Sequence, residues 1–176
     1  MRRPALLLIA ACVMAPHGAV AAAQSARATA QVRNAQGQVV GEAVALRERA
    51  EVRVRLTVRG FVPGIHGVHL HETGRCDAPA FASAGGHWNP ASRQHGRLNP
   101  QGPHLGDLPN LQVAPDGRGR LEFTIAIPGG TATHVHPLLD GDGTAIVIHA
   151  AADDDRTDPA GNSGARIACG AFAPVR

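Results

Sequence analysis

The chain contains no lysine and no tyrosine, and aromatic residues make up only 3% of its 176 positions. All 17 basic residues are therefore arginine, which excludes any mechanism that needs a lysine Schiff base. Because Trp88 and four phenylalanines are the only aromatic side chains, aliphatic residues must fill the core. Charged residues are also scarce, at 18%, and form no long run, which argues against a disordered chain.

What the sequence does contain points to a single domain rich in turns and histidine. Its length suits one domain, and an apolar content of 44% is enough to bury a core. The 21 glycines and 13 prolines disfavour a helical bundle and favour many turns. The ten histidines exceed what a core needs, and six of them fall between His66 and His104. This stretch is the first place to look for a functional site.

The first 23 residues have the pattern of an export signal. Two arginines precede an apolar run over residues 5–14, and a stretch of small residues ends at Ala23. The run is too short to cross a bilayer comfortably, so no transmembrane segment is expected. We expect residues 1–23 to be a signal peptide and residues 24–176 to be one mature domain, located in the periplasm or secreted.

Two features of this segment affect the expected partners and location. Cleavage removes two arginines, so the net charge falls from +3 to about +1. A nearly neutral chain gives no reason to expect nucleic acid or an anionic membrane as a partner.

The residues Ile-Ala-Ala-Cys ending at Cys12 resemble a lipoprotein cleavage box. The downstream Ala-x-Ala site favours soluble export. Lipid anchoring at Cys12 is the alternative.

Two cysteines, Cys76 and Cys169, remain after signal removal. An exported chain lies in an oxidising compartment, where an even pair of cysteines predicts one disulfide. The alternative is two free buried thiols.

Several segments alternate between apolar and polar residues or are rich in β-branched residues, as strands do. They are residues 28–34, 38–46, 51–58, 67–71, 121–127 and 145–150. Turn sequences such as Pro-Asp-Gly and Asp-Gly-Asp-Gly separate them, and no amphipathic helix is found. The pattern predicts an all-β sandwich or barrel. Residues 72–110 and 153–164 lack periodicity, so we expect them to be functional loops.

The histidines have the spacing of metal ligands. His69 and His71 are two residues apart in an expected strand, so both imidazoles project to the same face. His149 ends another expected strand and could supply a third ligand. Such an imidazole-rich set suits copper, zinc, iron or nickel. His134 and His136 form a second alternating pair without a third ligand, so we expect them to be exposed; the alternative is an accessory metal-capture site.

The remaining ligands divide into two sets that need one more imidazole each. His95, His104 and Asp107 with one further imidazole would make a closed tetrahedral zinc site. His69, His71 and His149 with one further imidazole would make a tetragonal nitrogen site suited to Cu(II). Only His87 remains for both places, and an imidazolate with one metal on each nitrogen would serve both.

Four segments carry a resemblance to a known family: residues 64–71 (GIHGVHLH), 83–90 (SAGGHWNP), 104–108 (HLGDL) and 161–170 (GNSGARIACG). The first and last resemble the two signatures of copper/zinc superoxide dismutases, and the middle two resemble the metal loop of that family. The resemblance covers the whole mature chain. It implies a Greek-key, eight-stranded β-barrel or sandwich with long metal-binding and electrostatic loops.

The resemblance also implies a role for each candidate residue. The copper ligands would be His69, His71, His87 and His149, and the zinc ligands would be His87, His95, His104 and Asp107. Asp153 would be a carboxylate linking a copper-side and a zinc-side imidazole, with His69 and His95 as its expected partners. Arg166 would attract the anion above copper, and His66 would bond the backbone near the site. Cys76 and Cys169 would form the disulfide.

The implied activity is superoxide disproportionation to dioxygen and hydrogen peroxide, with copper cycling between Cu(II) and Cu(I) and His87 and Arg166 as catalytic residues. One copper and one zinc cation per subunit are the implied cofactors, and a homodimer is one arrangement that stays open. Two alternatives belong to other functional classes. One is an exported copper- and zinc-binding carrier without turnover, and the other is an adhesive sandwich with incidental metal.

Overall fold

The computed structural model describes residues 27–48, 50–127 and 138–175. The predicted signal peptide, including Cys12, and the pair His134 and His136 lie outside the described residues. Within the described ranges, no helix is long and apolar enough to cross a membrane.

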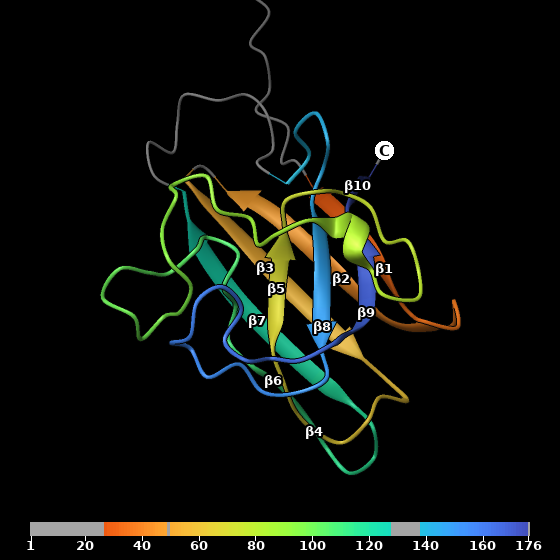
Figure 1. Ribbon diagram of the computed structural model, residues 1–176. Helices are drawn as coiled ribbons and strands as arrows, with labels where there is room; N and C mark the ends of the chain where they lie inside the picture. Colours follow the sequence, from red (N-terminus) through yellow and green to blue (C-terminus); the bar gives the residue numbers. More distant parts are fainter. Residues whose placement is uncertain (1–26, 49, 128–137, 176) are drawn as a thin grey trace, which may run out of the picture.

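The regular structure of the described residues consists almost entirely of antiparallel strands (Figure 1). The elements are β1 (Arg27–Asn34), β2 (Val39–Glu48), β3 (Glu51–Val58), β4 (Gly64–His66), β5 (Val68–His71), the 3-10 turn η1 (Ala82–Ala84), β6 (Leu111–Val113), β7 (Gly119–Ala126), β8 (Ala145–His149), β9 (Arg166–Ala171) and β10 (Ala173–Pro174).

The sheet closes almost completely on itself through β4 and β5. The order of neighbours is β4-β6-β7-β3-β2-β1-β9-β8-β5, and only Gly67 separates β4 from β5. The two ends of the path therefore meet in one interrupted strand. If β9 and β10 are also taken as one interrupted strand, the barrel has eight strands. The connection from β3 to β4 passes over β7 and β6. The connection from β7 to β8 passes over β6 and the interrupted strand formed by β4 and β5. Both are the crossings of the predicted Greek-key arrangement.

The alternating sequences place aliphatic side chains inside the barrel. In β3, Val52, Val54 and Leu56 are buried, whereas the arginines between them are not. The same alternation in β5 and β8 turns Leu70 and Ile146 into the core. Because the barrel interior is filled by aliphatic side chains, the polar histidines of these strands must lie on its outer surface.

All six predicted strand segments match their strands within two residues at each end. The prediction missed β4, β6, β9 and β10. Strands β4, β6 and β10 have two or three residues, too few to show a period. Strand β9 is covered on both faces, so its sequence does not alternate: Ala168 joins the barrel core, whereas Cys169 joins a second apolar cluster with Phe81 and Ala84.

The two stretches without periodicity are loops, as predicted, and they lie over the face formed by β5 and β8 (Figure 1). The predicted disulfide is also confirmed: Cys76 and Cys169 are bonded, with their Cα atoms 5.6 Å apart. It joins the start of the first loop to β9. The covered outer face of β5, β8 and β9 is where the candidate site lies.

Candidate metal centre

The outward-facing side chains of β5 and β8 form the base of the site. His69 and His71 alternate with Val68 and Leu70, which point into the core. His149 ends β8, just after an irregularity in the pairing of β8 with β9, and its backbone N–H donates to Gly67 O at 2.9 Å. The ring centroids of His149 and His69 are 4.8 Å apart. We call His69, His71 and His149 the strand histidines.

The long loop supplies the other candidate ligands, and His87 lies between the two sets. Its ring centroid is 3.9 Å from that of His69 and 5.0 Å from that of His71. On its other side, the His87 centroid is 5.2 Å from that of His95 and 5.3 Å from that of His104. We call His95, His104 and Asp107 the loop ligands. The structure thus brings all seven predicted ligands together, and each is buried.

Two groups of four have potential ligand atoms within 4.8 Å of one another. One is His69, His71, His87 and His149, the predicted copper set. The other contains His87, His95 and Asp107 of the predicted zinc set, but with His69 in place of His104. His104 lies beside this second group, with its Nδ1 atom 3.2 Å from Asp107 Oδ1 and 3.3 Å from His87 Nδ1.

Fixed hydrogen bonds leave one nitrogen free on each strand histidine. His71 donates from Nδ1 to Gly85 O at 3.0 Å, and His149 donates from Nδ1 to Gly164 O at 3.1 Å. His69 donates from Nε2 to Asp153 at 2.6 Å. Since a neutral imidazole has one N–H, the opposite nitrogen of each ring keeps a lone pair available for a metal.

Those opposite nitrogens have no other partner. Among the described residues, the buried side-chain atoms that lack a hydrogen bond include His69 Nδ1, His71 Nε2 and His149 Nε2. Three such atoms would together cost roughly 3–9 kcal/mol, at 1–3 kcal/mol for each buried polar group left unsatisfied. Metal ions would satisfy these atoms, and all-imidazole and imidazole–carboxylate sets are the donors that copper and zinc take. The residues therefore fit the two implied metals.

One carboxylate oxygen organises the loop ligands. Asp107 Oδ1 lies 2.9 Å from His87 Nδ1, 3.1 Å from His95 Nδ1 and 3.2 Å from His104 Nδ1. Burial alone would raise the pKa of Asp107, but hydrogen bonds from His87, His95 and the Gly96 N–H outweigh it and lower the pKa. Asp107 is therefore an anion among three imidazoles, as in a site built for a divalent cation.

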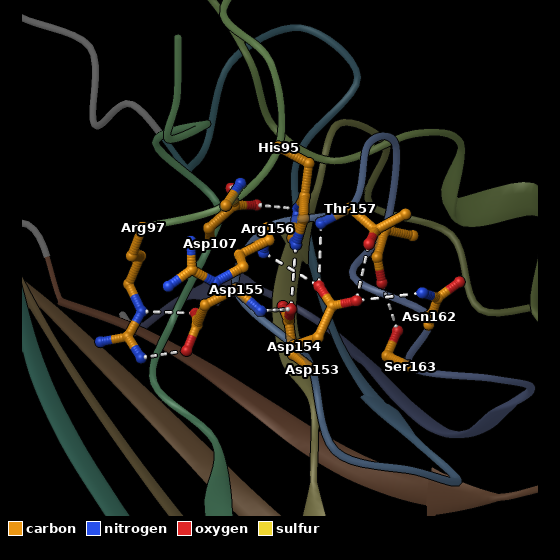
Figure 2. A network of polar contacts seen from close by, with 12 residues as sticks. His95, Arg97, Asp107, Asp153, Asp154, Asp155, Arg156, Thr157, Asn162 and Ser163 are labelled. Atoms are coloured by element: carbon orange, nitrogen blue, oxygen red, sulfur yellow. Dashed lines mark hydrogen bonds and ion pairs between the residues drawn. The ribbon is translucent and has the colours of Figure 1, made fainter. Parts of the chain in front are cut away.

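Asp153 links the two sides, as predicted, through His69 and His95; Figure 2 shows its contact with His95. Its Oδ2 atom accepts from His69 Nε2 at 2.6 Å, and its Oδ1 atom accepts from His95 Nε2 at 3.0 Å. Burial acts to raise the pKa of Asp153, but these two hydrogen bonds lower it overall. The side chain of Asn110 holds the backbone of Asp153 at both polar groups. Its Nδ2 atom donates to the Asp153 carbonyl at 2.9 Å, and its Oδ1 atom accepts from the Asp153 N–H at 2.8 Å. The sequence analysis missed Asn110, although it follows the HLGDL motif by two residues.

The strand histidines and the loop histidine His95 have opposite protonation behaviour. Burial lowers the pKa of His69 to about 3, that of His71 to about 2 and that of His149 to about 4. Burial also acts to lower the pKa of His95, but its hydrogen bonds to Asp107 and Asp153 raise the pKa to about 10. The strand histidines are therefore ready to donate lone pairs at neutral pH, whereas a metal at His95 must displace a proton.

Arg166 lies at the opening of the site. Its Nη1 atom donates to Phe81 O at 2.8 Å, and its Nη2 atom donates to Gly85 O at 2.7 Å. The same Gly85 carbonyl accepts from His71, so one peptide orients both the arginine and a candidate ligand. The open depression beside Arg166, about 620 Å³ in volume, is otherwise lined by alanine, proline and glycine. Among the described residues, Arg166 is the one charged residue that lines it.

The predicted backbone contacts of His66 are also confirmed. Its Nδ1 atom is 2.8 Å from His149 O and its Nε2 atom is 2.9 Å from Val62 O. His66 thus ties the end of β8 to the turn before β4, and it is not among the candidate ligands.

Comparison with known proteins agrees with this geometry. The sequence model of the copper/zinc superoxide dismutase family matches residues 35–172. A Cu-Zn superoxide dismutase of Aquifex aeolicus is 41% identical over 150 residues, which cover 84% of this chain and 86% of that protein. One from Caulobacter vibrioides is 41% identical over 145 residues, covering 81% and 83% of the two chains.

Solved structures give the same result. A superoxide dismutase-like protein from Bacillus subtilis matches with a TM-score of 0.74 and 38% identity, over 82% of this chain and 97% of that one. The Cu/Zn superoxide dismutase of Brucella abortus matches with a TM-score of 0.62 and 27% identity, over 84% and 99%. Together with the barrel and its paired metal-ligand groups, these matches show that the chain belongs to the copper/zinc superoxide dismutase family.

Proposed function

We propose that this chain converts superoxide to dioxygen and hydrogen peroxide, with copper on His69, His71, His87 and His149 and zinc on His87, His95, His104 and Asp107. The observation that carries the assignment is the position of His87 between two buried groups: the strand histidines with their unpartnered nitrogens, and the loop ligands around the Asp107 carboxylate. When bound, copper supplies an ion that changes oxidation state, and zinc supplies a redox-silent cation. Because the predicted ligands and Arg166 are all present, the dismutase is favoured over a carrier without turnover.

His87 is the residue best placed to hold and release a proton. Its Nδ1 atom faces Asp107 and His104, so its Nε2 atom is the one available on the side of the strand histidines. Burial lowers the pKa of His87, although hydrogen bonding to Asp107 opposes the effect. A proton taken up at Nε2 is therefore released readily to a reduced anionic substrate nearby.

Arg166 attracts and orients the substrate anion. Two backbone carbonyls fix its guanidinium, so little entropy is lost when an anion approaches. The small uncharged residues around it add no competing charge. A single positive charge in such an opening exerts a stronger field than one in bulk water.

A cytochrome c reduction assay on the copper- and zinc-loaded protein tests the activity. We expect inhibition of superoxide-driven reduction at a rate well above that of an equal concentration of free copper. A rate no higher than that of free copper would overturn the enzyme assignment and leave the metal-carrier function.

We also propose that residues 1–23 direct export and that the mature protein acts in the periplasm or outside the cell. The support is the disulfide, which persists in oxidising compartments, and the bacterial relatives. Mass spectrometry of the native N-terminus distinguishes the outcomes. Cleavage after Ala23 supports soluble export, a lipid on Cys12 gives a membrane-anchored form instead, and an intact Met1 contradicts export.

We further propose a homodimer, which rests on two exposed aliphatic side chains, one just before β4 and one within it. Val62 and Ile65 are 65% and 53% exposed, which is high for large apolar residues. They are three positions apart in the sequence. Sedimentation of the wild-type protein and of Ile65→Asp tests this surface. A wild-type dimer that dissociates on substitution is expected, and a wild-type monomer would contradict the proposal.

A further inference from the structure

We propose that Asp155 and Arg97 form a clasp between the two loops and act as positioning residues for the Asp153 carboxylate. This proposal rests on the proposed metal ligands, because Asp153 acts through its hydrogen bonds to His69 and His95. The clasp would hold the zinc side in place from outside the set of ligands (Figure 2).

The side chains of the clasp make a two-point ion pair. Arg97 Nε donates to Asp155 Oδ1, and Arg97 Nη2 donates to Asp155 Oδ2, each at 2.9 Å. The two side chains are 33% and 14% exposed, whereas those of the ion pair of Arg53 with Glu48 on the barrel are 42% and 54% exposed. A bidentate and partly shielded pair is stronger and more directional than an exposed single contact.

The backbone of Asp155 connects the same two elements. Its N–H donates to Asp153 Oδ1 at 2.6 Å, and its carbonyl accepts from the Leu98 N–H at 2.9 Å. Asp155 has a φ of 59°, a left-handed conformation that asparagine and aspartate tolerate better than most residues. The side chain and both backbone polar groups of this one residue therefore serve to join Asp153 to the segment that follows His95.

The two loops approach each other too closely for this contact to be incidental. A Cβ atom on Gly96 would collide with the Asp155 carbonyl, and one on Gly161 would collide with the Asp153 carboxylate and His95. In addition, Asp158 Oδ1 accepts from the His95 backbone N–H at 2.6 Å. Segments 95–98 and 153–161 therefore fit in only one relative position.

The effect of the clasp should fall mainly on zinc. Within the part of the chain that the structure describes, two donors hold Asp153 Oδ1: His95 Nε2 and the Asp155 N–H. If the clasp is lost, the carboxylate and His95 can shift together, because both belong to loops. His69 remains fixed by its pairing with β8. We therefore expect faster release of zinc, with little change in the affinity for copper.

The experiment compares Arg97→Gln, Asp155→Asn and the double variant in the mature, copper- and zinc-loaded protein. Zinc release to the chelator 4-(2-pyridylazo)resorcinol gives a rate, and the Cu(II) electron paramagnetic resonance spectrum reports the copper ligands. We expect each single variant to release zinc roughly 3- to 10-fold faster, below the 10–100-fold typical of residues that touch a ligand directly. The double variant should be no faster than the faster single variant, because both substitutions remove one interaction. Arg97→Lys keeps the positive charge, so its zinc release should be slower than that of Arg97→Gln but faster than that of the wild type.

Arg156→Gln is the matched control. Arg156 lies in the same loop, but its side chain makes no hydrogen bond or ion pair among the described residues. This variant should release zinc at the wild-type rate, and equal acceleration by Arg97→Gln and Arg156→Gln would overturn the clasp. Additive effects in the double variant would also overturn it. His95→Gln separates the two proposals: if it speeds zinc release while the clasp variants do not, only the clasp fails, whereas no effect of His95→Gln contradicts the zinc site itself.

Discussion

His69, His71 and His149 come from strands of the barrel, whereas His95, His104 and Asp107 come from the long loop. Adjacent strands β5 and β8 fix the strand histidines, and these rings are buried as neutral imidazoles. Among the loop ligands, His95 and His104 face the Asp107 carboxylate, and His95 favours the protonated form when no metal is bound. The copper side is therefore organised by the fold before metal binds, whereas the zinc side depends on contacts between loops and on the metal.

The largest effects should come from removing one ligand on each side. His149→Gln should abolish dismutation while zinc is retained, because the redox-active ion is proposed to lie on the strand histidines. His95→Gln should lose zinc but keep part of the activity. Metal content by mass spectrometry and the cytochrome c assay check both variants. Loss of both metals in each variant would show that the two sides are not separable.

The next largest effect should come from the disulfide, which holds the loop covering the strand histidines. Cys76 and Cys169 are separated by 93 residues, so their replacement by alanine should lower the unfolding free energy by about 4–5 kcal/mol in the chain-entropy model. Denaturant unfolding of the metal-loaded protein measures this change. A decrease below about 1 kcal/mol would mean that the loop is held by packing alone.

A smaller effect is expected at the opening. Arg166→Ala should lower the second-order rate constant about 10-fold and flatten its dependence on ionic strength, because electrostatic attraction of the anion is lost. Stopped-flow kinetics at several salt concentrations provide the measurement, with Arg53→Gln on the far barrel surface as a control. An unchanged salt dependence in Arg166→Ala would contradict its role.

The smallest effect is expected in how the folding stability of the metal-free protein depends on pH, which differs between the two sides. The strand histidines have pKa values lowered to about 2–4, so between those values and 6.5 the unfolded chain binds more protons and stability falls as pH falls. The pKa of His95 is raised to about 10, so its contribution is present below pH 6.5 and is lost as pH rises through 10.

Melting temperatures across pH test this difference. His149→Gln should make the acidic side of the curve less steep, and His95→Gln should do the same for the alkaline side. Both substitutions changing the same side would contradict the opposite protonation of the two sets.

The sequence predicted the strand part of the molecule better than the loop part, for a physical reason. Alternation located β3 and placed His69 and His71 on one face, because side chains of a strand point to opposite faces in turn. The count of candidate ligands singled out His87, and the family resemblance assigned roles to Asp153 and Arg166. No local pattern could reveal Asn110, the Gly85 carbonyl that joins Arg166 to His71, or the pairing of Arg97 with Asp155, because these contacts depend on how distant loops meet.

The shared position of His87 is tested most directly by a crystal structure of the metal-loaded protein, with anomalous diffraction recorded at the copper and zinc absorption edges. We expect copper on one nitrogen of the His87 ring and zinc on the other. Two ions with His87 bound to only one of them, or to neither, would contradict it.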